Sequence, residues 1–400
     1  MSKLSTTGVN NNSNRPWSFL LWADWATRPQ RHHHFAREIL RRGHSLTVAA
    51  MVSSRHALKR PGRSLSAQVN AWHFPEQLHG AALRLKYYLP FHRFGLVRRL
   101  DDARQARFLN GLFAGGPYDI GIMNHPTRTP INKGKVNFLI YDVMDDLPAL
   151  LHLGGARSEE IADFVRREEH LAQTADLIFT VSPPIFARFR ARFPHKTFLA
   201  PNGVEYDRFA PDNGPDPPPL PFPAGPPLIV FAGALGEWFD WDTLFYCCEA
   251  LPDCNFLVMG GFSAKIHRLV KERRHPNLEL LGQVPYPRLP AIFRRAQAGI
   301  IPRVNHPATQ AMSPLKLYEY LAAGLPVVSS PMQDCINLAA PGLVYVADSP
   351  AAFAASLKEA VHLSRRPDLV RQRRSIARQH SWQQRWQSCE ELIAAHFKAC

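Results

Sequence analysis

One stretch near the C-terminal end, residues 308–330, constrains the fold more than any other part of the chain. It reads ATQAMSPLKLYEYLAAGLPVVSS. Pro314 predicts the start of a helix, because the first helical residue needs no N–H donor. Gly324 predicts a left-handed cap at the end of that helix, and Pro326 prevents its continuation. The apolar residues from Val327 onward then predict a buried strand, so the stretch indicates a helix-to-strand unit of a parallel α/β sheet.

Two charged residues of this predicted helix, Lys316 and Glu319, are suited to a charged ligand. A lysine and free N–H groups in the first turn favour phosphate oxygens. The glutamate one turn later can accept hydrogen bonds from sugar hydroxyls. An ordinary buried helix whose lysine extends to solvent explains the apolar residues, but not the whole string.

The string EYLAAGLPVV, which begins at Glu319, resembles the donor-binding helix of retaining GT-B glycosyltransferases. This large family includes phosphatidylinositol mannosyltransferase and bacterial surface-polysaccharide glycosyltransferases. The resemblance implies that Glu319 binds the nucleotide ribose, and that Ser313 and Lys316 also lie on the donor side. Many members carry a second glutamate eight positions earlier, toward the donor sugar, where this chain has Ala311. The Ser-Pro-Leu-Lys variant from Ser313 to Lys316 resembles a subgroup of surface-polysaccharide enzymes.

Short apolar runs elsewhere predict two series of parallel strands that alternate with helices. The first series comprises residues 18–23, 45–52, 118–124, 136–143 and 177–182. The second comprises residues 228–232, 255–259, 278–281, 299–301, 327–330 and 343–346. Such alternation predicts an α/β protein with two doubly wound, Rossmann-like domains facing a central cleft. The resemblance identifies this architecture as GT-B and implies that the C-terminal helix, residues 381–399, returns to the first domain.

The domain boundary is expected in a proline-rich segment. Residues 198–209, FLAPNGVEYDRF, resemble the family's crossing between domains, and Asn202-Gly203 predicts a tight turn with positive φ. Residues 210–227 hold a proline-rich, stiff linker. We therefore expect an acceptor-side domain at 1–209 and a nucleotide-sugar-binding domain at 228–380. Residues 381–400 would form the helix that crosses back.

Cations are expected where the donor diphosphate binds. Gly233 ends the first strand of the second series, where glycine lets backbone N–H groups approach a pyrophosphate. Many relatives carry an arginine and a lysine on this loop, where this chain has Ala234 and Asp240. Arg303 and Lys316 are therefore the expected phosphate ligands. Retaining transfer then relies on electrostatic stabilisation of the leaving diphosphate, with Lys316 in a catalytic role and with neither an enzymic nucleophile nor a cofactor.

Polar residues at the C-terminal strand ends of the first series are the predicted acceptor side, because open α/β sheets bind ligands there. They are Asp24, Arg28, His125 and Asp145. The string IYDVMDD resembles the strand end where many members carry an active-site histidine, and Asp142 falls there. The resemblance implies that Asp142 is catalytic and orients the acceptor hydroxyl or the donor sugar. Asp142, Asp145 and Asp146 together could bind a divalent cation, but the resemblance implies that no metal is needed.

The histidine cluster and the cysteines favour neither a metal site nor a disulfide framework. His32, His33 and His34 are consecutive, and consecutive helical residues point in different directions, so a basic surface turn is expected rather than a metal site. The six cysteines form no CxxC pair. This pattern predicts scattered buried thiols in a reducing compartment.

The net charge of +15 is concentrated in the first half. Residues 1–205 hold 28 Lys and Arg against 16 Asp and Glu, or +12, which leaves +3 for residues 206–400. Such a field implies an anionic partner: nucleic acid, a membrane surface or a phosphate-bearing substrate. Residues 78–113 are predicted to be helical and mix basic with aromatic residues. An interfacial segment on anionic lipid and a helix pair with a solvated basic face both remain open.

No run reaches the roughly 20 apolar residues of a membrane-spanning helix, and the polar N-terminus lacks a signal-peptide core. We therefore expect a cytoplasmic protein, soluble or peripheral at the inner face of the membrane. The expected activity is transfer of a sugar from a nucleotide diphosphate to a lipid-linked glycan in bacterial surface-polysaccharide synthesis. The same architecture serves nucleotide-sugar epimerases and hydrolases. A nucleic-acid-binding protein is a remote alternative, because no helix-turn-helix or finger signature accompanies the charge.

Overall fold

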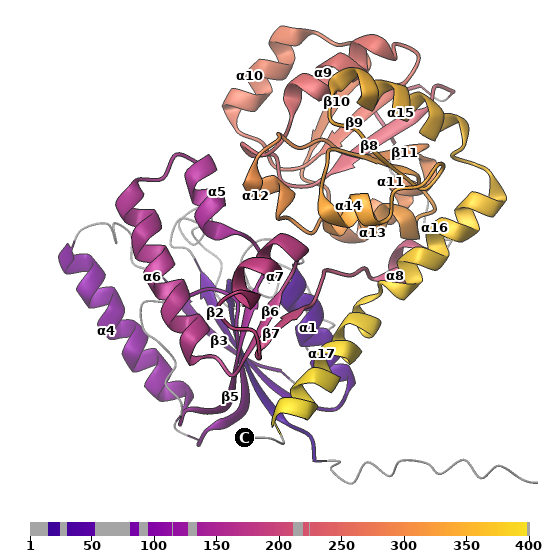
Figure 1. Ribbon diagram of the computed structural model, residues 1–400. Coiled ribbons are helices and arrows are strands. Elements are labelled where there is room, and N and C mark those ends of the chain that lie inside the picture. Colours follow the sequence, from indigo (N-terminus) through magenta and orange to yellow (C-terminus); the bar gives the residue numbers. More distant parts are fainter. Residues whose placement is uncertain are drawn as a thin grey trace, which may run out of the picture. The chain divides into compact units, whose positions relative to one another are not determined.

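The computed structural model describes residues 15–24, 30–52, 81–87, 95–113, 115–126, 134–210, 219–223 and 225–397. The chain divides into two compact units. Unit 1 comprises residues 1–28, 36–123 and 129–139, and unit 2 comprises residues 29–35, 124–128 and 140–400. Figure 1 shows the course of the chain and labels its elements. No helix among the described residues is long and apolar enough to span a membrane.

The first sheet has seven strands in the order β3-β2-β1-β4-β5-β6-β7. Its strands are β1 (Ser18–Asp24), β2 (Ser45–Val52), β3 (Ala81–Tyr87), β4 (Tyr118–Met123), β5 (Val136–Val143), β6 (Leu177–Thr180) and β7 (Thr197–Leu199). The helices along this part of the chain are α1 (Arg31–Arg41), α4 (Gly95–Leu112), α5 (Leu147–Leu153), α6 (Ser158–Thr174) and α7 (Pro183–Arg190). Parallel pairing of β1 with both β2 and β4 puts a reversal of strand order at β1. This is the doubly wound topology that the alternation predicted.

The predicted helix over residues 78–113 is only half correct. Residues 81–87 form β3, which pairs in parallel with β2, and α4 begins at Gly95. Leu83, Arg84, Leu85 and Lys86 alternate apolar with charged residues, which is the two-residue period of a strand. The sequence prediction overlooked this change of period. The remainder of the predicted segment before α4 lies outside the described residues.

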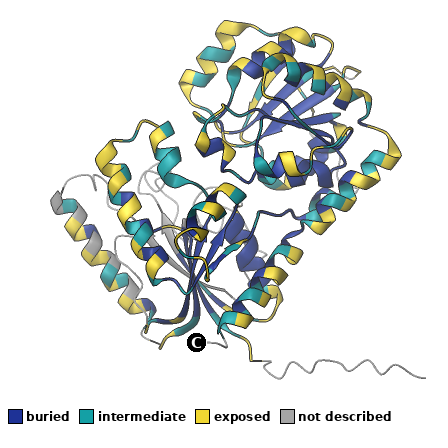
Figure 2. Cartoon of the chain, in the orientation of Figure 1, coloured by how far each residue is buried: buried dark blue, intermediate teal, exposed yellow. Residues whose placement is uncertain are grey.

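The second sheet has six parallel strands in the order β10-β9-β8-β11-β12-β13. They are β8 (Leu228–Ala232), β9 (Asn255–Met259), β10 (Leu278–Gly282), β11 (Ala298–Ile301), β12 (Val327–Ser329) and β13 (Val344–Val346), all within a few residues of the predicted positions. The central strands β8, β11 and β12 are buried along their whole length, as Figure 2 shows for the middle of the sheet. The helices are α8 (Tyr206–Phe209), α9 (Trp241–Ala250), α10 (Ala264–Arg273), α11 (Leu289–Arg295), α12 (Pro307–Gln310), α13 (Leu315–Ala322), α14 (Gln333–Asn337), α15 (Pro350–His362) and α16 (Pro367–Gln379), with a 3₁₀ turn η1 at Tyr286–Arg288.

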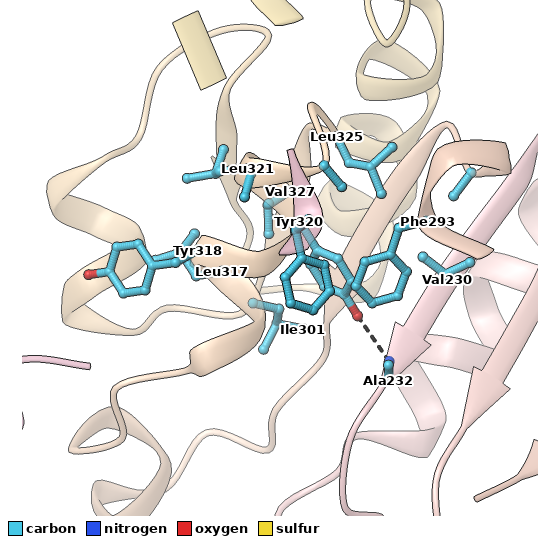
Figure 3. Packing of buried hydrophobic residues seen from close by; sticks show 14 of the residues in the cluster. Val230, Ala232, Phe293, Ile301, Leu317, Tyr318, Tyr320, Leu321, Leu325 and Val327 are labelled. Atoms are coloured by element: carbon cyan, nitrogen blue, oxygen red, sulfur yellow. Dashed lines mark hydrogen bonds between the residues drawn. The ribbon is translucent and has the colours of Figure 1, made fainter. Parts of the chain in front are cut away.

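Helix α13 is anchored in the core on one face of this sheet. Leu317 and Leu321 are fully buried there beside Phe293 of α11. The hydroxyl of Tyr320 accepts a hydrogen bond of 2.9 Å from the backbone N–H of Ala232, at the end of β8 (Figure 3). The ring of Tyr320 lies so close to Gly299 that a Cβ there would be 2.4 Å from it. These contacts fix α13 against the C-terminal end of β8 and the first half of β11.

The final helix, α17 (Trp382–Phe397), packs on α1, as the resemblance implied for a helix returning to the first domain. The ring of Trp382 stacks on His34 at 4.5 Å, and Trp386 meets Phe35 edge-on at 5.0 Å. Gly203 does not have the predicted positive φ. Instead, a Cβ there would lie 2.8 Å from the carbonyl oxygen of His380, so glycine permits a close approach of two chain segments.

The three histidines predicted to form a basic surface turn are buried in α1, so that prediction was wrong. His32, His33 and His34 expose 1%, 4% and 2% of their surfaces. His32 lies 3.2 Å from Asn124, and His34 lies 3.3 Å from Glu205. The five described cysteines are buried and form no disulfide with one another, as predicted for scattered thiols.

Candidate active site

The candidate donor site is built on the first turn of α13. The ammonium of Lys316 pairs with the carboxylate of Glu319 three residues later. Glu319 exposes only 3% of its surface, and its Oε1 accepts a 3.2 Å hydrogen bond from the hydroxyl of Tyr286 in η1. Burial raises the pKa of Glu319, whereas Lys316 and Tyr286 oppose that rise. A buried carboxylate with two fixed donors, beside a lysine that is partly exposed, can receive a hydroxylated and phosphorylated ligand.

Arg303 supplies a second positive charge, directly after β11. Its guanidinium carbon lies 5.9 Å from the centre of the Phe231 ring. Its Nε and Nη1 atoms are buried and make no hydrogen bond to any residue that the structure describes. Burial lowers the pKa of Arg303 to about 10, so the side chain remains protonated at neutral pH. A buried cation with unused donors is costly unless an anion accompanies it, which makes Arg303 a candidate phosphate ligand.

The loop after β8 holds the backbone around Arg303. Residue Phe239 forms an antiparallel bridge with Arg303, and Val304 donates a 3.1 Å hydrogen bond to the carbonyl of Trp238. Asp240, which stands where many relatives carry a cation, accepts a 2.9 Å bond from the N–H of Thr243 and caps α9. The loop therefore positions the segment that carries Arg303 instead of supplying charge itself.

Two predicted donor-side residues, Gly233 and Ser313, make internal hydrogen bonds. The N–H of Gly233 donates to the carbonyl of Met259 over 2.9 Å. Ser313 donates to the carboxylate of Asp334, and its carbonyl accepts a 2.8 Å bond from the side chain of Asn202. The backbone just before α13 is therefore tied to the segment around Asn202.

Ala311, at the place of the missing second glutamate, ends α12. It is buried, and its carbonyl accepts a 2.6 Å hydrogen bond from the hydroxyl of Ser182. The methyl side chain offers no polar group to a sugar. Recognition of the donor sugar by a carboxylate at this position is therefore absent from this chain.

Asp142 occupies the predicted strand end, but its carboxylate faces α1. The Nε atom of Arg31 lies 2.9 Å from both carboxylate oxygens of Asp142. Nη1 of Arg31 also donates to the carbonyl of Pro201 over 3.1 Å. Burial raises the pKa of Asp142, and Arg31 counteracts that rise. The pair joins β5, α1 and the segment at Pro201.

Asp145 is the predicted acceptor-side residue that the structure brings near the donor-side residues. Burial and the neighbouring Asp146 raise its pKa to about 7, and the charge of Arg303 opposes them. Asp146 accepts a 3.2 Å bond from the N–H of Ala149 and caps α5. The three aspartates therefore have different partners: Arg31 for Asp142, Arg303 for Asp145 and the N–H of Ala149 for Asp146. Among the described residues, no group of three His, Cys, Asp or Glu side chains could hold a metal ion.

The other predicted acceptor-side residues are not gathered at this site. His125 is exposed and meets Phe164 edge-on at 5.4 Å. The side chain of Asp24 and the whole of Arg28 lie outside the described residues.

Sequence reasoning missed Arg31 and Tyr286, whose partners are distant in the chain. Tyr286 lies in a proline-rich stretch, PYPR, which the pattern of strands and helices left unassigned. The spacing of Lys316 and Glu319 was readable because both lie on one helix. Only the fold reveals that Tyr286 approaches the same carboxylate.

Comparison with solved structures defines the class of fold. The chain matches sucrose-phosphate synthase from Thermosynechococcus elongatus with a TM-score of 0.70 and 14% identity, covering 96% of this chain and 100% of that one. It matches HepE from Anabaena in complex with UDP and glucose with a TM-score of 0.64 and 14% identity, and the match covers 95% of this chain and 100% of HepE. It matches WaaG, a glycosyltransferase involved in lipopolysaccharide biosynthesis, with a TM-score of 0.59 and 15% identity. That match covers 94% of this chain and 99% of WaaG. These likenesses show the fold, and the chain has the GT-B architecture.

Sequence comparison matches part of the chain to a family. Residues 226–362, which include α13 and Arg303, match the family described as Glycosyl transferases group 1. The chain is also 28% identical over 256 residues to TuaH of Bacillus subtilis (strain 168), described as a teichuronic acid biosynthesis glycosyltransferase. That alignment covers 61% of this chain and 64% of TuaH.

Proposed function

We propose that this chain is a glycosyltransferase that takes a sugar from a nucleotide diphosphate donor. The observation that carries the proposal is the Lys316–Glu319 pair on the first two turns of α13, inside the region that matches group 1 glycosyltransferases. The buried guanidinium of Arg303 with its unused donors supports it. A nucleotide sugar needs a hydrogen-bond acceptor for its hydroxyl groups, which Glu319 supplies, and positive charges for its diphosphate, which Lys316 and Arg303 supply.

Each donor-side residue has a distinct part in this proposal. Glu319 accepts hydrogen bonds from the ribose hydroxyls, and Lys316 leaves its partial pairing with Glu319 to bind a phosphate oxygen. Arg303 binds the diphosphate with charge-assisted hydrogen bonds. Gly233 and Ser313 shape the loops on either side. Because Arg303 and the buried carboxylate of Glu319 are held by the fold, the main rearrangement on binding is the movement of the Lys316 side chain.

The reaction that we propose retains the configuration of the sugar. The bond between the anomeric carbon and the diphosphate oxygen breaks, and a bond to the acceptor oxygen forms. The acceptor proton passes to the departing phosphate, whose growing charge Lys316 and Arg303 stabilise. Asp145, which lies in the field of Arg303, is our proposed contact for the acceptor. Asp142 holds α1 through Arg31.

For the acceptor, we propose a lipid-linked glycan of a surface polysaccharide at the cytoplasmic face of the membrane. TuaH and WaaG, which this chain resembles, are described as glycosyltransferases of teichuronic acid and lipopolysaccharide biosynthesis. Arg99, Arg104 and Arg107 of α4 are exposed and suit an anionic surface. We keep the assignment of residues 1–209 to the acceptor and of residues 228–380 to the donor, joined by the linker at 210–227 and followed by the crossing helix at 381–400.

A screen of nucleotide sugars tests the proposal. UDP-glucose is the first donor to try, because HepE, which shares the fold, was solved with UDP and glucose. Release of the nucleoside diphosphate that depends on an added glycan acceptor supports transfer. Conversion of the nucleotide sugar into an isomer, with no nucleotide released, indicates an epimerase instead. Release at an equal rate with and without acceptor indicates a hydrolase.

A further inference from the structure

The hydroxyl of Tyr286 is held against the carboxylate of Glu319 from outside helix α13. It donates to Oε1 of Glu319 over 3.2 Å, whereas Lys316 pairs with Oε2 of the same carboxylate. The two oxygens of Glu319 therefore have different partners from different elements. Such a division fixes the rotation of the carboxylate plane, which a single lysine on the same helix does not do.

The ring of Tyr286 is itself fixed by its neighbours. The guanidinium of Arg208 lies 5.4 Å from the ring centre, and the ammonium of Lys316 lies 5.6 Å from it. Phe209 meets the ring edge-on at 5.6 Å. Nε of Arg208 in turn lies 2.7 Å from Oε2 of Glu205. Cation–π contacts and an edge-to-face pair restrict the ring, so its hydroxyl presents a stationary donor.

We propose that Tyr286 is a positioning residue that orients Glu319 toward the ribose hydroxyls of the donor nucleotide. The inference rests on the proposed function, because it needs Glu319 to be the ribose ligand. Without the tyrosine hydroxyl, the carboxylate is free to turn toward Lys316. In that orientation the carboxylate of Glu319 is poorly aligned to accept hydrogen bonds from a ribose. Its stronger pairing with Lys316 also competes with the binding of Lys316 to the diphosphate.

The consequence is a loss of discrimination between ribose and deoxyribose. Glu319 has acceptor sites for Tyr286, for Lys316 and for a ribose hydroxyl at the same time, because an ionised carboxylate has about four lone-pair sites. A site built to hydrogen-bond a hydroxyl rejects an analogue that lacks it. Tyr286 therefore contributes to the preference for the ribonucleotide, and not only to overall affinity.

The test compares the affinity for UDP with that for 2′,3′-dideoxy-UDP, by calorimetric titration of the parent and of Tyr286→Phe. We expect the parent to prefer UDP. In Tyr286→Phe the ratio of the two dissociation constants should fall about five- to tenfold, which is within the range for the net contribution of one ordinary hydrogen bond. Tyr345→Phe is the matched control, because the hydroxyl of Tyr345 also donates to a glutamate, Glu359, over 3.1 Å. That variant should keep the parent ratio.

Each outcome separates the two claims. A folded Tyr286→Phe protein with the parent ratio overturns the positioning role and leaves the proposed function standing. A parent that binds UDP and its dideoxy analogue equally contradicts the ribose assignment of Glu319 and the positioning role with it. If the parent binds neither, the titration uses the diphosphate that the donor screen selects, and a failure to bind that nucleotide as well contradicts the proposed function. If Tyr286→Phe does not fold, Arg208→Met frees the same ring while keeping the hydroxyl. It should lower the ratio in the same direction, and an unchanged ratio counts against the proposal.

Discussion

Nε of Arg31 lies 2.9 Å from both carboxylate oxygens of Asp142, and these side chains expose only 2% and 1% of their surfaces. Removing one partner leaves an uncompensated buried charge, so Arg31→Met should destabilise the protein by about 3–5 kcal/mol. Asp142→Asn should also be strongly destabilising. The double variant Arg31→Met/Asp142→Leu should recover part of the loss. Urea unfolding followed by circular dichroism measures each free energy of unfolding.

The matched control for this pair is Arg157→Ala, which breaks the exposed ion pair of Arg157 with Glu160. It should change the free energy of unfolding very little, because exposed pairs are weak. If Arg31→Met were as stable as Arg157→Ala, the pair would not anchor α1. Asp142 would then be open again to a direct part in the reaction.

We expect replacement of Arg303 by methionine to weaken binding of UDP without lowering the free energy of unfolding. Replacing the Arg303 guanidinium, whose Nε and Nη1 make no hydrogen bond to the described residues, with methionine removes a desolvated charge that Asp145 offsets only in part. The free energy of unfolding of Arg303→Met should therefore stay level or rise. Its affinity for UDP should fall about tenfold or more, whereas affinity for uridine, which has no phosphate, should not change. A variant that loses affinity for both ligands equally would show that Arg303 only supports the fold.

Asp145 should make stability depend on pH. Its pKa is raised from 3.8 to about 7, so the folded state binds the proton more tightly than the unfolded state. Its contribution to stability is therefore fully present below about pH 4 and is lost as the pH rises through 7. Asp145→Asn should remove this dependence. Between pH 5 and pH 8, the free energy of unfolding of the variant should therefore fall less than that of the parent. Urea unfolding at the two pH values tests this, with Asp163→Asn as the control, because the Asp163 side chain on α6 is exposed. Parallel pH profiles for the parent and Asp145→Asn would contradict the assignment.

The charge of α4 should direct binding to anionic lipid. Arg99, Arg104 and Arg107 are exposed, and each cation near such a surface contributes roughly 1 kcal/mol. Changing all three to Glu should abolish sedimentation with anionic liposomes, and added salt should weaken binding of the parent.

The control for α4 changes Lys265, Arg268 and Lys271 of α10 to Glu. These residues are also exposed, and the change in net charge is the same. Retained binding in the α10 variant, with loss in the α4 variant, would locate the surface at α4. Equal loss of liposome binding in both variants would show that binding depends on the net charge of the protein and not on α4. Binding of the parent to neutral liposomes, independent of salt, would contradict an electrostatic origin.

The sequence predicted what local patterns encode. The six strands of the second sheet are short apolar runs with turn residues between them, and α13 carries its own start and stop signals, so both were located. Within the site, Lys316 and Glu319 were found because three residues of helix bring them to one face. Strand β3 was missed because the mixture of basic and apolar residues around Arg84 was interpreted as helical amphipathicity.

What the sequence could not show are contacts that only the fold creates. His34 is buried because Glu205 and Trp382, from distant parts of the chain, close over it. Asp142 was placed correctly at a strand end, but nothing near it in sequence indicates that Arg31 occupies its carboxylate. Tyr286 reaches Glu319 across 33 residues of sequence. Long-range pairing of this kind leaves no periodic pattern for a single sequence to display.

The most direct test of the account is calorimetric titration of UDP, or of the diphosphate of whichever nucleotide the donor screen selects, against the parent and two variants. Lys316→Ala and Glu319→Ala should each weaken binding by about 1.5–3 kcal/mol, or roughly ten- to a hundredfold, because each removes a charge-assisted contact. Lys358→Ala, an exposed lysine on α15, should bind as the parent does. Unchanged affinity in both folded α13 variants would contradict the donor site, and with it the proposed function.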